Sequence, residues 1–353
     1  MNRRRFLQTT GLASTAALAG CAGLFETKSI PREPPMVEDR PDAVYYPTHT
    51  EGMAMAGMAK QGRWRLGLMY SFPHRFWLMG GGTSKQQEKV TVQEGDDVHL
   101  MATVWDAETM TVLPAGDVRI ELSKGDWSET RPMWPMLSQN MGFHFGDNMG
   151  LDGDGKYKAE VQVGGVNIRR TGALSGQFDS AETLTTEFEF SQQKLEELPF
   201  ERLDKKKGSQ GSVPPMEMEM MPMSHVPPKS DLPGQFLGEQ MSGDAEFLVT
   251  SGEDTDFAKD TYLLVSPRTP YDNRYPIPMM SLSATLNRGG ETVFDGALTP
   301  TVDPDIGYHY GANVKSVESG DELTVSVDSV PQVSRHEGYE TAFLKMSNMQ
   351  FSV

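Results

Sequence analysis

The chain has 353 residues, of which 37% are hydrophobic, and its formal net charge is −17. At about 150 residues per domain, this length predicts two domains and additional linker. A surface this acidic repels nucleic acid and anionic membranes, and it is the charge balance with which halophiles keep proteins soluble in concentrated salt. The single cysteine excludes disulfides within the chain, thiolate zinc sites, iron–sulfur clusters and blue-copper sites.

Residues 1–21 have the pattern of an export signal. A basic start leads into an apolar run at 11–20 that is too short to span a bilayer. The arginine pair and the Phe-Leu pair within residues 3–7 are typical of the twin-arginine route, and the Leu-Ala-Gly-Cys sequence ending at Cys21 is similar to a lipobox. We therefore expect a lipid anchor at Cys21, on the extracytoplasmic face of the cell membrane. The alternative is a retained segment with a buried cysteine.

Composition divides the rest of the chain into blocks. Residues 22–43 hold four prolines among charges and are expected to form a disordered tether. Residues 191–235 contain seven prolines and the tract PPMEMEMMPMSHVPP, which predicts a Pro/Met-rich linker. The two remaining blocks, 44–190 and 236–353, are the predicted domains.

Both blocks are predicted to be all-β. Apolar and polar residues alternate with a period of two in short runs that are rich in β-branched and aromatic residues, and Gly, Asp, Asn and Pro separate the runs. This spacing predicts two tandem immunoglobulin-like β-sandwiches joined by the linker. The clearest runs are 98–105, 117–122, 156–163 and 183–190 in the first block, and 262–265, 281–286, 323–327 and 342–351 in the second.

One motif occurs once in each block. Residues 142–148 read GFHFGDN and residues 307–313 read GYHYGAN, with a histidine between aromatic residues in both. We interpret this as duplication of one sandwich, against the alternative of two coincidental histidine strands. In a strand the aromatic residues face one side and the histidine the other. If the aromatic residues pack the core, His144 and His309 face an outer surface or a cleft.

The first block offers four candidate metal ligands. His99 and Met101 lie two residues apart, so they share one face of a strand, opposite Leu100 and its apolar neighbours. Met136 precedes His144 by eight residues, a spacing that lets a loop fold the thioether back beside the imidazole. Imidazole with thioether suits copper.

The second block offers three candidates of a different kind. Asp305 precedes His309 by four residues, and His336 follows after one more predicted strand. Imidazole with carboxylate suits iron, manganese or zinc. The predicted cofactor is therefore copper or iron. Imidazoles that share an ion should lie within about 5 Å of each other, because metal–nitrogen bonds are about 2 Å long.

Methionine is concentrated in two tracts, and thioethers at this density can collect Cu(I). The alternative is composition alone, because the chain has 23 methionines. The tracts contain Met53, Met55 and Met58, and then Met216, Met218, Met220, Met221 and Met223 with His225.

With these residues in view, the chain resembles the bacterial periplasmic iron-transport accessory proteins. That family consists of immunoglobulin-like sandwiches that bind copper and iron, pair as homodimers and serve ferrous-iron permeases. The resemblance implies a membrane iron permease as partner and an intrachain pseudo-dimer of the two domains. The matching residues are 98–100, 135–136 and 144–146 in the first block, and Asp305, 309–313 and 335–336 in the second.

The departures from the family pattern leave each block with part of a ligand set. The first block has Met101 where Glu is expected, Asn140 near the position of an expected Asp, and an arginine pair at 169–170 where the last His would fall. The second has Tyr262, Leu264 and Thr301 where His, Glu and Met would stand.

Two hypotheses follow. In the first, His99, Met136 and His144 complete one three-ligand site, and Asp305, His309 and His336 complete another. In the second, the sites have decayed and the protein is a structural or partner-binding lipoprotein. An enzyme is not expected, because nucleophile-elbow, phosphate-loop and HExxH motifs are absent from the sequence.

Overall fold

The computed structural model describes residues 34–80, 87–253, 260–271 and 273–353, which belong to the unit Arg32–Val353. The expected signal, Cys21 and most of the expected tether lie outside the described residues. No helix among the described residues is long and apolar enough to cross a membrane.

The chain is nearly all-β, as the alternating runs predict. In the described residues the helical elements are one short α-helix, α1 (Gln192–Glu196), and two 3-10 turns, η1 (Gly172–Leu174) and η2 (Lys229–Asp231). The run predicted at 156–163 forms β11 (Gly155–Val163), in which alternate side chains from Tyr157 to Val163 are buried in the main core. The period-two pattern is thus realised as one core-facing side of a sheet.

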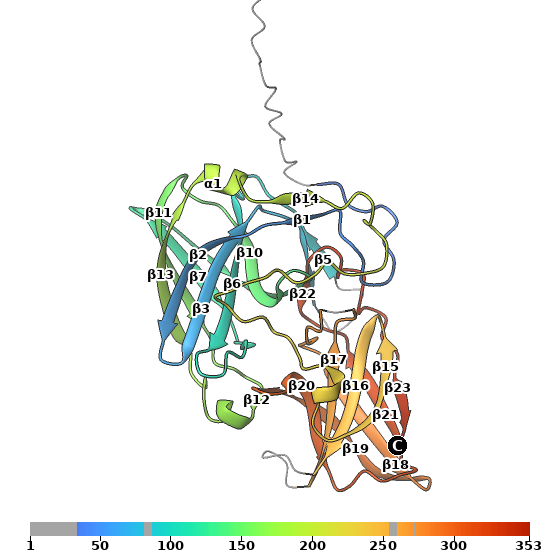
Figure 1. The fold of residues 1–353 in the computed structure, drawn as a ribbon. Helices are drawn as coiled ribbons and strands as arrows, with labels where there is room; N and C mark the ends of the chain where they lie inside the picture. The colour runs from blue at the N-terminus through green and yellow to red at the C-terminus, as the bar shows by residue number, and fades with distance from the viewer. Residues whose placement is uncertain (1–33, 81–86, 254–259, 272) are drawn as a thin grey trace, which may run out of the picture. The chain divides into compact units, whose positions relative to one another are not determined.

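Two sheets form most of the first block (Figure 1). The larger has eight strands in the order β2-β3-β6-β10-β9-β22-β4-β5, and the smaller has the order β13-β11-β7-β8. The strands of the larger sheet are β2 (Ala54–Gln61), β3 (Trp64–Ser71), β6 (Val98–Asp106), β10 (Gly142–Met149), β9 (Trp134–Ser138), β22 (Ser334–Arg335), β4 (Phe76–Met79) and β5 (Gln87–Val90). Those of the smaller sheet, besides β11, are β13 (Glu182–Phe190), β7 (Arg119–Lys124) and β8 (Trp127–Pro132).

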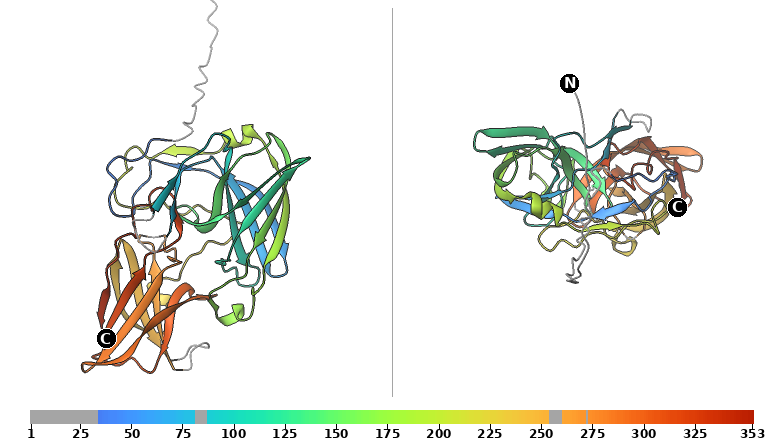
Figure 2. Two further views of the ribbon diagram at one scale, coloured as in Figure 1. Left: turned by 180° about the vertical axis from the view of Figure 1, so that it is seen from behind. Right: turned by 90° about the horizontal axis from the view of Figure 1, so that it is seen from above.

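The second block forms a nine-stranded arrangement whose path runs β15-β16-β17-β20-β19-β18-β21-β23. The long strand β19 pairs with β18 through its first part and with β20 from Thr299 onward, so one strand serves two sheets. Figure 2 shows these yellow-to-red strands gathered in one group. Their bounds are β15 (Gln235–Ser242), β16 (Ala245–Gly252), β17 (Thr261–Arg268), β18 (Ser281–Arg288), β19 (Glu291–Asp303), β20 (Gly307–Val314), β21 (Glu322–Ser329) and β23 (Met349–Ser352).

The two blocks exchange short strands. β22, from the second block, pairs in parallel with β9 of the first, with Ser334 opposite Met136. β12 (Arg169–Arg170), from the first block, pairs in parallel with β19 of the second, with Arg169 opposite Thr301. The labels β22 and β12 in Figure 1 mark these two crossings. Each block therefore completes a sheet of the other.

The segment 191–235 contains structured and buried residues. β14 (Phe200–Arg202) pairs with β1 (His49–Glu51), and Val213, Met221 and Val226 are buried. Part of the proline- and methionine-rich tract covers the outer face of β3. A Cβ on Gly67 would collide with the sulfur of Met221, so that position requires glycine.

This cover changes the environment of β6. The sequence predicts that His99, Met101 and Trp105 face outward, and they do lie on the face opposite Leu100. All nine residues of β6 are nevertheless buried, because a second layer of chain packs on that outer face. Met101 and Trp105 belong to a separate apolar cluster with Met221.

Gly142 begins β10 and adopts a φ of +67°, a region that favours glycine. A Cβ there would lie 2.6 Å from the ring of buried Tyr275. We expect Gly142→Ala to lower the free energy of unfolding by about 2–4 kcal/mol, combining the backbone cost with overpacking. Urea denaturation measures the loss. Gly153→Ala is the matched control, because its φ is +65° and a Cβ there meets nothing within 4 Å. Equal losses in the two variants would contradict the expected clash.

Candidate metal centre

Four side chains from four adjacent strands converge on one face of the eight-stranded sheet. His144 of β10 lies opposite Met136 of β9, and Asn148 of β10 lies opposite His99 of β6. His336 follows β22 directly, and its backbone N–H donates to the carbonyl of Leu137. Strand pairing therefore brings together His99, Met136, His144 and His336.

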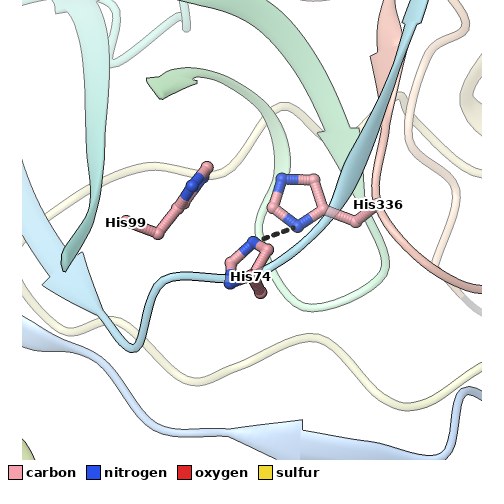
Figure 3. A group of neighbouring side chains, drawn as sticks. All are labelled: His74, His99 and His336. Carbon is pink, nitrogen blue, oxygen red and sulfur yellow. Dashed lines mark hydrogen bonds between the residues drawn. The ribbon is translucent and has the colours of Figure 1, made fainter. Parts of the chain in front are cut away.

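The imidazoles lie at ligand-sharing distances. The ring centroid of His336 is 5.3 Å from that of His99 and 5.1 Å from that of His144. His74, in the loop between β3 and β4, lies 4.1 Å from His99 and 4.8 Å from His336 between ring centroids. Figure 3 shows these three side chains pointing toward one another, and one donor atom from each lies within 4.8 Å of the others.

Hydrogen bonds determine which nitrogen of His99 carries the proton. Nδ1 of His99 lies 2.9 Å from Oδ1 of Asn148. The amide orientation of Asn148 is set by the backbone of His74, because its Nδ2 donates to the carbonyl of His74 and its Oδ1 accepts from the backbone N–H. Oδ1 can only accept, so Nδ1 of His99 donates. Nε2 of the neutral ring is therefore unprotonated and has a free lone pair.

The same reasoning applies to His144 and His336. Nδ1 of His144 donates to the carbonyl of Gly142 at 3.1 Å. Nδ1 of His74 lies 3.1 Å from the carbonyl of Phe72, and Nε2 of His74 lies 3.1 Å from Nδ1 of His336. In a neutral His74 ring whose proton is on Nδ1, Nε2 accepts this hydrogen bond from Nδ1 of His336. The neutral rings of His144 and His336 thus also present an unprotonated Nε2.

All three of these Nε2 atoms are buried without a hydrogen-bond partner among the described residues. An unsatisfied buried polar atom costs about 1–3 kcal/mol, and each one in a native structure needs an explanation. Burial lowers the pKa of His144 to about 4 and those of His99 and His336 well below the usual value of 6.5. The rings are therefore neutral at physiological pH, as metal ligands must be.

Gly146 leaves room for a donor atom between strands. A Cβ at this position would lie 2.8 Å from Nε2 of His99 and 3.2 Å from Sδ of Met136. Met136 is fully buried but belongs to neither the main core nor the other apolar clusters of the described residues. Its sulfur thus faces the imidazole side of the sheet. The thioether of Met136 and the imidazole of His99 therefore border the same space beside Gly146.

A carboxylate supports the group from outside. Glu51 of β1 accepts from Nε2 of His49 at 2.9 Å and lies 3.6 Å from Nδ1 of His74. Burial opposes ionisation of Glu51, but the hydrogen bonds from His49 and His74 outweigh it and lower its pKa to about 2. Glu51 is therefore a carboxylate that orients His74, which in turn orients His336.

Sequence reasoning missed His74, Glu51 and Asn148. Asn148 could have been found, because it closes the repeated motif in both blocks. His74 and Glu51 stand in no motif. They lie beside the other histidines only because strands that are far apart in the sequence pair in the fold.

The second block places different residues at the corresponding positions. His309 of β20 repeats the local geometry of His144, with Nδ1 3.1 Å from the carbonyl of Gly307. Strand register puts Tyr262 opposite Asn313 and Thr301 opposite His309. Tyr262 and Thr301 thus occupy the places that His99 and Met136 hold in the first block. The hydroxyl of Tyr262 lies 3.1 Å from Nε2 of His309, the nitrogen that has no partner in His144.

The structure separates the candidates of the second block. His336 lies with the histidines of the first block. The residue that corresponds to it is Thr171, directly after β12, whose N–H donates to the carbonyl of Val302 as that of His336 does to Leu137. Asp305 is exposed, and its backbone N–H donates to Asp303. Among the described residues, the His/Asp/Glu group close enough to hold an ion is His74, His99 and His336.

A pocket leads to the histidine group. His74 and His336 line it together with Met101, Glu51, Met53 and Met141. Met101 lies on the same face of β6 as His99, but it packs in the cluster of methionines rather than against Met136. The histidine group therefore borders a pocket whose lining also holds thioethers and two carboxylates, Glu51 and Glu337.

Comparisons with known proteins cover parts of the chain. Residues 230–352 match a family described as a domain of unknown function, DUF7350. No curated protein matches the sequence. Two crystal structures of FetP from uropathogenic Escherichia coli strain F11 are similar to parts of the fold: the as-isolated protein and a copper-bound variant with a single substitution.

The likeness to FetP is low. The as-isolated structure has 16% identity and a TM-score of 0.29, and the match covers 39% of this chain and 96% of FetP. The copper-bound variant has 17% identity and a TM-score of 0.30, over 40% of this chain and 92% of FetP. At such values we take neither fold nor function from FetP, and rely on the residues described above.

The buried histidines predict acid sensitivity of the metal-free protein. Burial lowers the pKa of His309 to about 4, as it does for His144. Unfolded histidines have a pKa near 6.5, so between pH 6.5 and 4 the unfolded state binds more protons and stability falls as pH falls. His144 and His309 each contribute about 3 kcal/mol to this loss. Asp147, whose pKa burial raises to about 6, acts in the opposite sense.

Urea denaturation at pH 7.5 and 4.5, with a chelator present, measures this loss. We expect a lower free energy of unfolding at pH 4.5, and a smaller difference between the two pH values in His309→Gln. A pH-independent free energy over this range would show that the histidines are not held neutral by burial.

Proposed function

We propose that this protein is an extracytoplasmic metal-binding protein that holds one copper ion through His99, His144, His336 and Met136. One observation carries the proposal: three buried histidines have Nε2 atoms without hydrogen-bond partners among the described residues, and the ring of His336 lies 5.3 Å from that of His99 and 5.1 Å from that of His144 between centroids. The thioether of Met136 borders the same space as Nε2 of His99. A metal ion would satisfy all three lone pairs at once.

The donor set favours copper over iron. Three imidazoles with a thioether are soft to intermediate ligands that suit copper, whereas iron and manganese favour carboxylate oxygen. Glu51, the carboxylate nearest this group, is held by His49 and His74.

We propose one imidazole centre, in the first block, rather than one centre in each block. In the second block a tyrosine hydroxyl contacts His309, and threonines replace the positions of Met136 and His336. That block supports the centre by supplying His336. The alternative hypothesis of decayed sites therefore finds its support in the second block, and the proposed copper centre finds its support in the first.

For the cellular role, we propose that lipid on Cys21 tethers the protein to the outer face of the cell membrane. There it would deliver metal to, or assist, a membrane iron permease. The sequence features of residues 1–21 and the family resemblance support this role. Replacing Cys21 by Ser should release the protein from membranes into the soluble fraction, and crosslinking in intact cells should recover a permease with the wild-type protein.

The imidazole centre can be tested by removing one donor at a time. Copper analysis after dialysis should give one tightly bound Cu(II) per wild-type chain, and His99→Ala, His144→Ala or His336→Ala should weaken binding by more than 100-fold. His309→Ala is the matched control and should retain the ion. Equal copper in all four variants would refute the centre. Asn148→Ala, which removes a supporting hydrogen bond, should weaken binding by about 10–100-fold.

Gly146→Ala tests the same centre without removing a donor. The added methyl would occupy the space beside Nε2 of His99 and Sδ of Met136. We expect at least a 100-fold loss of copper affinity in a folded protein, checked by circular dichroism. Unchanged affinity in that folded variant would mean that the ion does not sit between these donors.

A further inference from the structure

Six methionines of the described residues gather in or against one small apolar cluster, separate from the main core. Four of its five buried members are methionines, against four of 56 in the main core. Two further methionines pack against it. The buried members are Met69, Met101, Trp105, Met141 and Met221, and the two others are Met53 and Met218.

The cluster is built on the outer face of β3 and β6. Met69 and Met101 lie directly opposite each other in the strand pairing. Met221 comes from the proline-rich tract and seats its sulfur over Gly67, the position where a side chain would collide with it. Three separate segments of the chain thus bring their thioethers to one place.

The cluster borders the pocket of the histidine group. Met53, Met101 and Met141 line this pocket together with His74 and His336. Glu51, which is held as a carboxylate, lies in the same lining. A small monovalent cation in the pocket would therefore have a carboxylate, three thioethers and two imidazoles within its lining, while Arg75 of the same lining is paired with Glu337.

Thioether sulfur is a neutral, soft, polarisable donor that selects Cu(I) over harder ions. We propose that Met53, Met101 and Met141 form a second metal site, which takes Cu(I) in this pocket. It uses residues distinct from the imidazole centre. It deepens the proposed function by giving copper a binding step outside that centre, but it stands or falls on its own measurement.

Ordinary core packing is the competing explanation, and a volume-conserving substitution separates the two. Leucine matches methionine in size and apolar character, and such exchanges usually cost less than about 1.5 kcal/mol. Leucine has no sulfur, however, so it cannot bind Cu(I). A triple variant with Met53→Leu, Met101→Leu and Met141→Leu should therefore fold and lose only this site.

The experiment is an anaerobic titration of the full chain with Cu(I) in competition with a chromophoric chelator. The wild type should bind two equivalents, and the triple leucine variant one. A variant with His99→Ala, His144→Ala and His336→Ala should keep one equivalent, and lose it when the leucines are added. Met133→Leu with Met149→Leu, which changes two methionines of the main core, is the matched control and should bind as the wild type does.

The outcomes distinguish the two proposals. If the histidine variant still binds one Cu(I) that the leucines abolish, the thioether site is established whatever becomes of the imidazole centre. If the triple leucine variant binds as much Cu(I), and as tightly, as the wild type, the thioether site is refuted while the imidazole centre stands. A histidine variant that binds no Cu(I) also refutes it.

Discussion

The candidate metal centre depends on the position of a two-residue strand, β22. Its parallel pairing with β9 moves a segment of the second block into the sheet of the first and leaves His336 beside His99 and His144. Arg335 holds this strand in place. The guanidinium is fully buried and donates to the carbonyls of Ala342 and Pro331, and burial lowers its pKa to about 9. Such a group is costly to bury unless it is hydrogen-bonded, so these contacts hold together the segment around β22 that carries His336.

The pairing of β12 with β19 in the second block is the counterpart of the pairing of β22 with β9. It allows the histidine strands of the two blocks to be compared. Both histidine strands begin at a glycine with positive φ and hold Nδ1 of the histidine on that glycine's carbonyl. In the second block, the hydroxyl of Tyr262 then satisfies Nε2 of His309. In the first block the equivalent nitrogen is left without a partner. The same backbone thus supports a closed hydrogen bond in one block and an open donor in the other.

The layer outside β6 makes the first block more than a simple sandwich. The methionine-rich tract packs over β3 and β6, whose outer face would otherwise meet water. This cover buries His99 and Met101 and sets the low pKa of the imidazole of His99. It also buries part of a tract that composition marks as linker, including Met221 and Val226. The chemistry of the site therefore depends on a segment that has little regular secondary structure.

The sequence alone determined the all-β class, most of the strand runs and the histidine candidates, because alternation with a period of two is a local property of the chain. The run expected at 342–351 is a strand only from Met349 onward. It also identified Tyr262 and Thr301 as departures, and strand register places both beside the His309 strand. It could not show that His336 serves the first block, that His74 and Glu51 join it, or that the methionines gather on one sheet face. Those placements depend on pairings between residues up to about 260 positions apart, and local patterning carries no information about which strand edges meet.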